Sequence, residues 1–141
     1  MSYSIRIHNR LQDIDVLHDQ LQKLQANWSL AKKCTCELNL VLDEIVTNII
    51  QHGGPELRTI DITLEKIENE LTITVIDDGP QVDPTTCKTP DTGVPLEKRT
   101  CGGLGILLVR RFSNCISYRR ANDTNILTVK KQIPAKCNRE C

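Results

Sequence analysis

The chain has 141 residues, a length typical of one domain that buries a single sizeable core. Its 18 Lys and Arg residues balance its 18 Asp and Glu residues, so no excess of charge points to nucleic acid or to an anionic membrane as a partner. Aromatic residues make up only 3% of the chain, which argues against a base-stacking surface and predicts an aliphatic core.

Targeting signals and cysteines indicate the compartment. No apolar run approaches the roughly 20 residues that span a bilayer, and the N-terminus lacks the apolar segment of a signal peptide. We therefore expect a cytoplasmic protein.

Seven cysteines, an odd number, fit reduced thiols better than a disulfide framework. A zinc site is disfavoured because no pair has the C-x-x-C spacing typical of such sites. Its four candidate ligands would be Cys34, Cys36, Cys137 and Cys141.

The first part of the chain predicts one strand and two helices. Residues 2–9 alternate apolar and polar side chains, which is typical of a half-buried strand. From Asp13 an apolar stripe at helical spacing indicates the first helix. An Asn-Trp-Ser break ends it, with Ser29 as the expected N-cap of the second helix. We expect the second helix to end near His52, because Gly-Gly-Pro follows.

The rest of the chain predicts two antiparallel hairpins. Strand-like alternation occurs at residues 57–67, 71–76, 115–120 and 126–133. The expected turns are at Glu68-Asn69 within the first pair and at Asn122-Asp123 within the second. A short helix is expected at residues 104–112, before the second hairpin.

A long segment without apolar periodicity separates the hairpins. Prolines and glycines punctuate residues 78–103, and such a segment inside a compact domain is usually functional. We interpret about residues 80–102 as a lid over a ligand, because the domain resumes after it. Residues 134–141 are expected to form a frayed tail. No repeat is visible, so we expect a single domain over residues 1–141.

The second predicted helix carries a polar stripe beside its apolar side. Glu44, Asn48 and His52 are four residues apart and therefore stack on one face of the helix. A carboxylate, a carboxamide and an imidazole in line are suited to chemistry, but a solvated helix face has the same pattern. On this stretch alone the two interpretations are evenly balanced.

Two glycine-containing segments follow the helix. Asp77 stands two residues before Gly79 at the end of a predicted strand, which by itself is an ordinary turn signal. Three glycines at 102, 103 and 105 open the short helix, where backbone N–H groups and the helix dipole favour an anion. A hinge before a helix is the alternative interpretation. The segment is neither a Walker A loop nor a Rossmann fingerprint.

In this order, the three segments resemble the N, G1 and G2 boxes of the GHKL (Bergerat-fold) ATPases, which include gyrase, MutL and histidine kinases. The closer resemblance is to the branch of bacterial anti-sigma factors that are serine/threonine kinases, and it covers about residues 5–132. It implies an α+β two-layer sandwich, with a mixed, mainly antiparallel sheet covered on one face by about three helices. The matching segments are Glu44-x-x-x-Asn48, Asp77-x-Gly79 and Gly102-Gly103-Leu104-Gly105.

The resemblance implies ATP and Mg²⁺ as ligands and a role for each matching residue. Asn48 would hold Mg²⁺ through its amide oxygen. Asp77 would accept a hydrogen bond from the adenine amino group, where guanine presents a carbonyl. Glu44 would be the general base, and Thr124 would help to hold Asp77 or adenine. The other nucleotide-binding positions would be Gly79, Gly102, Gly103, Leu104 and Gly105.

Two positions need comment beside this resemblance. Gln81 stands where many members have a second G1 glycine, a departure that would alter how the lid starts. His52 matches a histidine common in the family, but we expect it to satisfy carbonyl groups at the helix end rather than to act in catalysis.

The resemblance implies an ATP-dependent serine/threonine protein kinase. Its substrate would be a STAS-type anti-sigma antagonist, and it would regulate a sigma factor by partner switching. A homodimer is also implied, without direct nucleic-acid or membrane partners. The alternative is a nucleotide-sensing module that docks a partner without phosphorylating it.

A histidine kinase is a third and disfavoured interpretation. His18-Asp19 imitates a phosphoacceptor pair, but only about one short helix precedes residue 29, where a two-helix hairpin would be needed. We expect His18 to be solvated.

Overall fold

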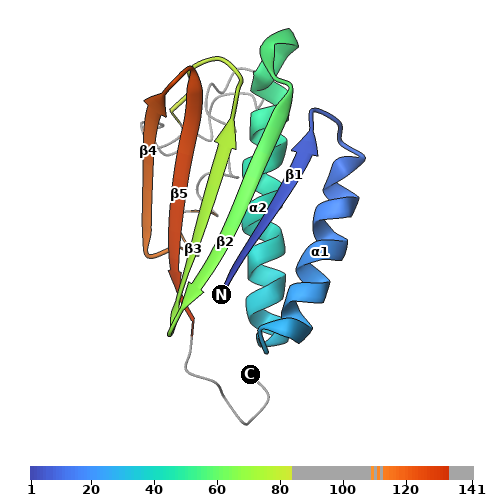
Figure 1. Ribbon diagram of the computed structural model, residues 1–141, viewed down its shortest axis with the longest axis vertical. Coiled ribbons are helices and arrows are strands. Elements are labelled where there is room, and N and C mark those ends of the chain that lie inside the picture. Colours follow the sequence, from blue (N-terminus) through green and yellow to red (C-terminus); the bar gives the residue numbers. More distant parts are fainter. Residues whose placement is uncertain (84–108, 110, 112, 134–141) are drawn as a thin grey trace, which may run out of the picture.

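The computed structural model describes residues 1–83, 109, 111 and 113–133. In this part of the chain, a five-stranded sheet packs with one face against two long helices (Figure 1). A 3₁₀ turn at Gly54–Glu56 follows the second helix. The elements are β1 (Ser2–His8), α1 (Asp13–Asn27), α2 (Lys32–Gly53), β2 (Thr59–Ile67), β3 (Glu70–Asp77), β4 (Cys115–Ala121) and β5 (Thr124–Gln132).

The sheet has the strand order β1-β2-β3-β5-β4, and each neighbouring pair is antiparallel. Because successive side chains alternate between faces, the register sorts residues into rows across the sheet. One row on the helix-covered face runs through Ile5, Ile62, Val75, Leu127 and Tyr118. The expected α+β sheet with helices on one face is therefore confirmed, and its described strands pair only in the antiparallel sense.

The core between sheet and helices is aliphatic, as expected, with Trp28 as its one aromatic residue among the described positions. Leu17 and Leu21 of α1 and Leu42 of α2 have no exposed surface. Each such side chain contributes about 1.5–3 kcal/mol when removed from water. This packing holds α2 across the sheet and so sets where its polar residues lie.

Both predicted hairpins are confirmed. The turn after β2 contains Glu68 with φ 54°, and the turn after β4 contains Asn122 (φ 51°) and Asp123 (φ 59°). Two consecutive left-handed residues, as at Asn122 and Asp123, are typical of a type I′ two-residue turn, and one at the first position, as at Glu68, is typical of type II′. Asn and Asp tolerate this conformation.

The expected N-cap at Ser29 is wrong. α2 begins at Lys32, and its N-cap is Ala31, which has no side-chain capping bond. Ser29 instead has φ 52° in the turn between the helices, whereas an N-cap residue needs an extended backbone directly before the first helical residue. The expected end of α2 near His52 agrees with the observed end at Gly53.

Three expectations fall wholly or mostly outside the described residues. Of the short helix expected at 104–112, Val109 and Arg111 are described; both are helical, and Val109 is buried. Two long helices are therefore described where about three were expected. The lid expected at 80–102 is described only for residues 80–83, and the tail at 134–141 is not described.

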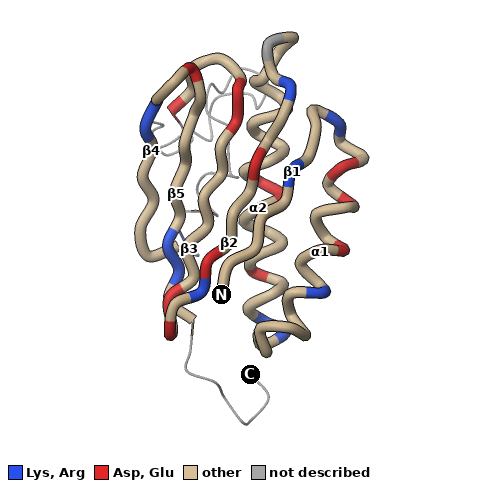
Figure 2. Tube along the Cα trace, viewed as in Figure 1, with Lys and Arg blue, Asp and Glu red and all other residues tan. Residues whose placement is uncertain are grey.

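Acidic and basic residues are interspersed along the described trace (Figure 2), in agreement with the balanced composition. Among the described helices, none combines the length and the apolar character needed to cross a membrane.

Candidate functional site

A pocket of about 480 Å³, including its open mouth, lies where the C-terminal end of α2 meets the end of β3 and the β4–β5 hairpin. Its walls combine aliphatic side chains with a few polar ones, which is typical of a small-molecule site. The aliphatic side chains include Ile45, Ile49 and Leu127, and the polar ones include Asn48, His52 and Asp77.

Asp77 is the last residue of β3 and is only 6% exposed. Its Oδ1 accepts hydrogen bonds from the backbone N–H of Gly79 (3.0 Å) and from Nδ2 of Asn125 (3.0 Å). Burial raises the pKa of Asp77, although these hydrogen bonds and the nearby Arg120 oppose the shift. Both hydrogen bonds end on Oδ1, so a ligand in the pocket would meet Oδ2.

Gly79 gives the backbone room beside this carboxylate. A Cβ at this position would lie 3.0 Å from Oδ1 of Asp77 and 3.6 Å from Cα of Gly53. Any larger residue at position 79 would therefore push against the carboxylate of Asp77.

Gly53, the last residue of α2, is required by packing. A Cβ there would lie 2.4 Å from Cδ2 of Leu57, which is buried. We expect Gly53→Ala to lower the free energy of unfolding by about 1–3 kcal/mol, since overpacking outweighs the better helix propensity of alanine. Urea unfolding measures this, with the exposed Gln51→Ala as a control from the same helix turn. An unchanged midpoint would show that Leu57 moves aside without cost.

Asn48 projects from α2 into the same pocket. Its Oδ1 is buried, and no hydrogen-bond donor reaches it within the described part of the chain. Leaving such an atom unpaired costs about 1–3 kcal/mol, so it calls for an explanation. Asn39 Oδ1 and Ser113 Oγ are also unpaired, but neither residue lines the pocket. A hard cation would satisfy the oxygen of Asn48.

Glu44 lies one helical turn before Asn48 on α2 and is partly exposed. It is not one of the described residues that line the pocket, and no described residue pairs with its carboxylate. The structure therefore brings Asn48 and Asp77 together and leaves Glu44 beside them. The predicted positions Gly102, Gly103, Leu104 and Gly105 lie outside the described residues.

Asn125, and not Thr124, holds Asp77 in the structure, and Thr124 is not among the described residues that line the pocket. The Thr124 hydroxyl donates to the backbone oxygen of Ala121 (2.7 Å), which closes the hairpin turn. The side chain that holds Asp77 is Asn125, directly opposite it in the β3–β5 register. Sequence reasoning missed Asn125, because only the pairing of β3 with β5 reveals that the two residues face each other.

The structure changes one of the two histidine expectations. His52 lines the pocket, and Gly54 forms the C-cap of α2. His18 is not simply solvated, because its Nε2 lies 2.6 Å from Oδ1 of Asp43 and so links α1 to α2.

No described group of three or more His, Cys, Asp or Glu side chains could hold a metal ion. Of the cysteines considered for zinc, Cys34 is buried, which raises the pKa of its thiol, and Cys36 is exposed. Cys137 and Cys141 lie outside the described residues.

Asp78 links the loop after β3 to the start of β2. Its Oδ1 accepts hydrogen bonds from the backbone N–H groups of Arg58 (2.8 Å) and Thr59 (3.1 Å). Burial alone would raise the pKa of Asp78, but these hydrogen bonds and the charge of Arg58 outweigh it and lower the pKa. The start of β2 is thereby fixed to the loop that follows Asp77.

We expect Asp78→Asn to lose about 0.5–1.5 kcal/mol of stability at neutral pH, because neutral hydrogen bonds replace charge-assisted ones at a partly solvated site. Since the folded-state pKa of Asp78 is lowered, its contribution is present above the ordinary aspartate value and is lost as the pH falls through the folded value. Melting temperatures of the two proteins should therefore converge in acid. A difference that does not change with pH would contradict this assignment.

Comparisons with known proteins agree with the fold. The profile of the histidine kinase-like ATPase domain matches residues 7–131. The chain is 33% identical over 110 residues to the serine/threonine-protein kinase BtrW of Bordetella bronchiseptica, covering 75% of each protein.

Two solved structures share the fold at low sequence identity. A Mycobacterium tuberculosis protein with RsbU and RsbW domains matches 96% of this chain with a TM-score of 0.67 at 13% identity, although the chain spans only 34% of that protein. The catalytic domain of the histidine kinase ThkA matches 94% of this chain and 99% of its own, with a TM-score of 0.56 at 14% identity. The chain therefore belongs to the histidine kinase-like ATPase family, within the GHKL superfamily.

Proposed function

We propose that the protein is an ATP-dependent serine/threonine protein kinase that phosphorylates a STAS-type anti-sigma antagonist and thereby regulates a sigma factor by partner switching. The observation that carries this proposal is the pairing, in one pocket, of a buried carboxylate at Asp77 with an unpaired amide oxygen at Asn48. The kinase BtrW, similar over three quarters of the chain, supports the reaction type.

The base of ATP would lie against Asp77. Its carboxylate would accept a hydrogen bond from the adenine amino group, and Gly79 would let the base approach the backbone. The aliphatic pocket walls would exclude water from the ring. The family resemblance makes Thr124 a second candidate contact for adenine, although its hydroxyl donates to Ala121 in this structure.

The phosphates would lie toward Asn48 and the glycines of the second segment. Asn48 would hold Mg²⁺ through the oxygen that lacks a donor, since Mg²⁺ prefers oxygen ligands and takes few from the protein. The ion would neutralise charge on the phosphate oxygens. Backbone N–H groups of Gly102, Gly103, Leu104 and Gly105 would cradle the phosphates.

Glu44 would act on the incoming hydroxyl. A neutral serine or threonine hydroxyl is a weak nucleophile, so a carboxylate that takes its proton speeds the transfer. Glu44 is one turn from Asn48 on the same face of α2, and the described residues leave its carboxylate without a partner.

Two measurements test this proposal. Calorimetric titration with ATP and with GTP in magnesium buffer should show binding of ATP and strong discrimination against GTP; equal affinities would contradict the role of Asp77. Incubation with radiolabelled ATP and the STAS-like proteins of the same genome should then label one of them. Binding of ATP and of a partner without labelling would favour the alternative, a nucleotide-sensing module.

A further inference from the structure

The side chain of Asn125 has all of its hydrogen-bonding capacity in use. Its Nδ2 donates to Oδ1 of Asp77 (3.0 Å) and to the backbone oxygen of Pro80 (2.8 Å). Its Oδ1 accepts from the hydroxyl of Tyr118 (2.5 Å) and from Nη1 of Arg120 (3.1 Å). Because arginine is only a donor, the amide cannot flip without facing donor against donor. We call Tyr118, Arg120 and Asn125 the Asn125 clasp.

The clasp determines which oxygen of Asp77 is available to a ligand. Oδ1 already accepts from Asn125 and from the backbone N–H of Gly79, so a proton cannot sit there without breaking one of these bonds. A proton on Asp77 would therefore reside on Oδ2. An ionised Asp77 offers Oδ2 as an acceptor, and a protonated Asp77 offers it as a donor.

The clasp also holds the first residues after β3. Nη1 of Arg120 donates to the backbone oxygen of Gly79 (2.8 Å), in addition to the bond from Asn125 to Pro80. The β4–β5 hairpin thereby fixes both the carboxylate and the loop that covers its edge of the pocket.

We propose that Asn125, held by Tyr118 and Arg120, is the positioning residue that presents Oδ2 of Asp77 to position 6 of a bound purine and so selects a 6-amino over a 6-oxo purine. The inference rests on the proposed function and deepens it, because it makes the selectivity depend on the protonation of Asp77. The ionised carboxylate accepts from a 6-amino group, whereas the protonated one donates to a 6-oxo group.

The surroundings of Asp77 bear on this titration. Burial raises the pKa of Asp77, so the change in selectivity should occur above the usual aspartate range. ATP and ITP share the same phosphates, so phosphate ionisation cancels in the ratio of their affinities. Among the described residues, the other titratable or charged groups facing Asp77 or the clasp are His52 from α2, Tyr118 and Arg120 from β4, and Asp78 and Asp83 from the loop.

The test is titration of ATP and ITP into the full chain at several pH values from acid to neutral. The wild type should prefer ATP at neutral pH and lose that preference as the pH falls. Asn125→Asp keeps an acceptor for Tyr118 and Arg120 but removes the donor to Asp77 and adds a like charge. We expect it to lower the ratio of ATP to ITP affinity by roughly tenfold or more at neutral pH, and to move the midpoint to higher pH.

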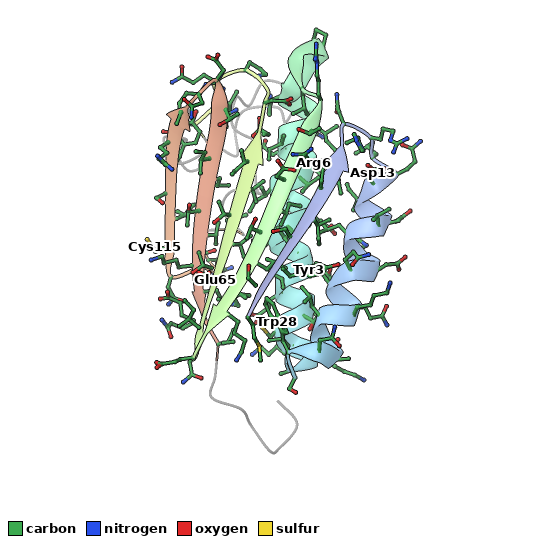
Figure 3. All side chains as sticks on the ribbon, viewed as in Figure 1. Tyr3, Arg6, Asp13, Trp28, Glu65 and Cys115 are labelled. Atoms are coloured by element: carbon green, nitrogen blue, oxygen red, sulfur yellow. The ribbon has the colours of Figure 1, made fainter. Side chains whose placement is uncertain are left out.

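Milder variants separate positioning from folding. Tyr118→Phe and Arg120→Gln each remove a donor to Asn125 and should shift the ratio and the midpoint in the same direction, by less. Tyr3→Phe and Arg119→Gln are the matched controls and should change neither. Tyr3 lies on β1, the edge strand at the other side of the sheet from β4 (whose first residue is Cys115; Figure 3), and its hydroxyl donates to Gln20 of α1. Arg119 is an exposed neighbour of Arg120.

The outcomes distinguish this inference from the proposed function. If the wild type binds no ATP, the proposed function is wrong. If the wild type binds ATP but shows no pH dependence of selectivity, or if the clasp variants keep the wild-type ratio and midpoint, the positioning role is wrong. Thermal unfolding identifies a variant that does not fold; in that case Tyr118→Phe, which loses only one hydroxyl, decides the question.

Discussion

Asp77→Asn is expected to weaken ATP binding by at least about 100-fold while the protein remains folded. The asparagine can keep its oxygen toward Gly79 and Asn125, which places its NH₂ group where the ligand meets Oδ2. That NH₂ would face the adenine amino group, donor against donor, between pocket walls that are mainly aliphatic. Calorimetric titration with ATP in magnesium buffer measures the loss.

Although Asp77→Asn should lose ATP affinity, its thermal stability should not fall. Because burial raises the folded-state pKa of Asp77, the folded protein holds this proton more tightly than the unfolded chain. The contribution of Asp77 is therefore fully present below the ordinary aspartate value and is lost as the pH rises through the folded value. At neutral pH the neutral amide avoids this loss, so Asp77→Asn should melt at the same temperature as the wild type or above it.

A matched control is Asp61→Asn. This substitution also removes one carboxylate from the sheet, but Asp61 lies on β2 outside the pocket lining and pairs with Arg6 of β1 (2.6 Å). It should leave ATP affinity unchanged. Wild-type ATP affinity in Asp77→Asn would remove Asp77 from the nucleotide site.

Glu44→Gln should separate binding from chemistry. The variant keeps the shape of the side chain and loses the proton acceptor, so ATP affinity should stay close to that of the wild type. Phosphotransfer to the cognate STAS-type protein should fall by about 10²–10⁴-fold, the usual contribution of a general base. Single-turnover transfer from radiolabelled ATP measures this rate.

The control for Glu44→Gln is Asp43→Asn, which removes the neighbouring charge of α2 and breaks only the link to His18. It should transfer phosphate at close to the wild-type rate. If Glu44→Gln transferred phosphate at the wild-type rate, another group would be the general base. If the variant lost ATP binding as well as transfer, Glu44 would be needed to maintain the nucleotide site rather than to accept a proton.

Local patterns in the sequence were sufficient to predict the secondary-structure elements and the protein family. Apolar spacing indicated α1, α2 and both hairpins, because each pattern reflects contacts within one element or across one turn. The motifs around Asn48 and Asp77 indicated a nucleotide pocket, and the structure brings these two residues to one pocket. The error at Ser29 was also local, since a left-handed backbone in the turn displaced the helix start to Lys32.

Only the tertiary structure decided which strands are neighbours. β3 pairs with β5 and not with β4, which precedes β5 in the chain, and this pairing sets Asn125 opposite Asp77. Turn chemistry cannot predict such a contact, because it joins residues 48 positions apart whose pairing depends on packing of the whole sheet against α1 and α2. The family motifs thus follow from the sequence alone, whereas the clasp that orients Asp77 follows from the order of the strands.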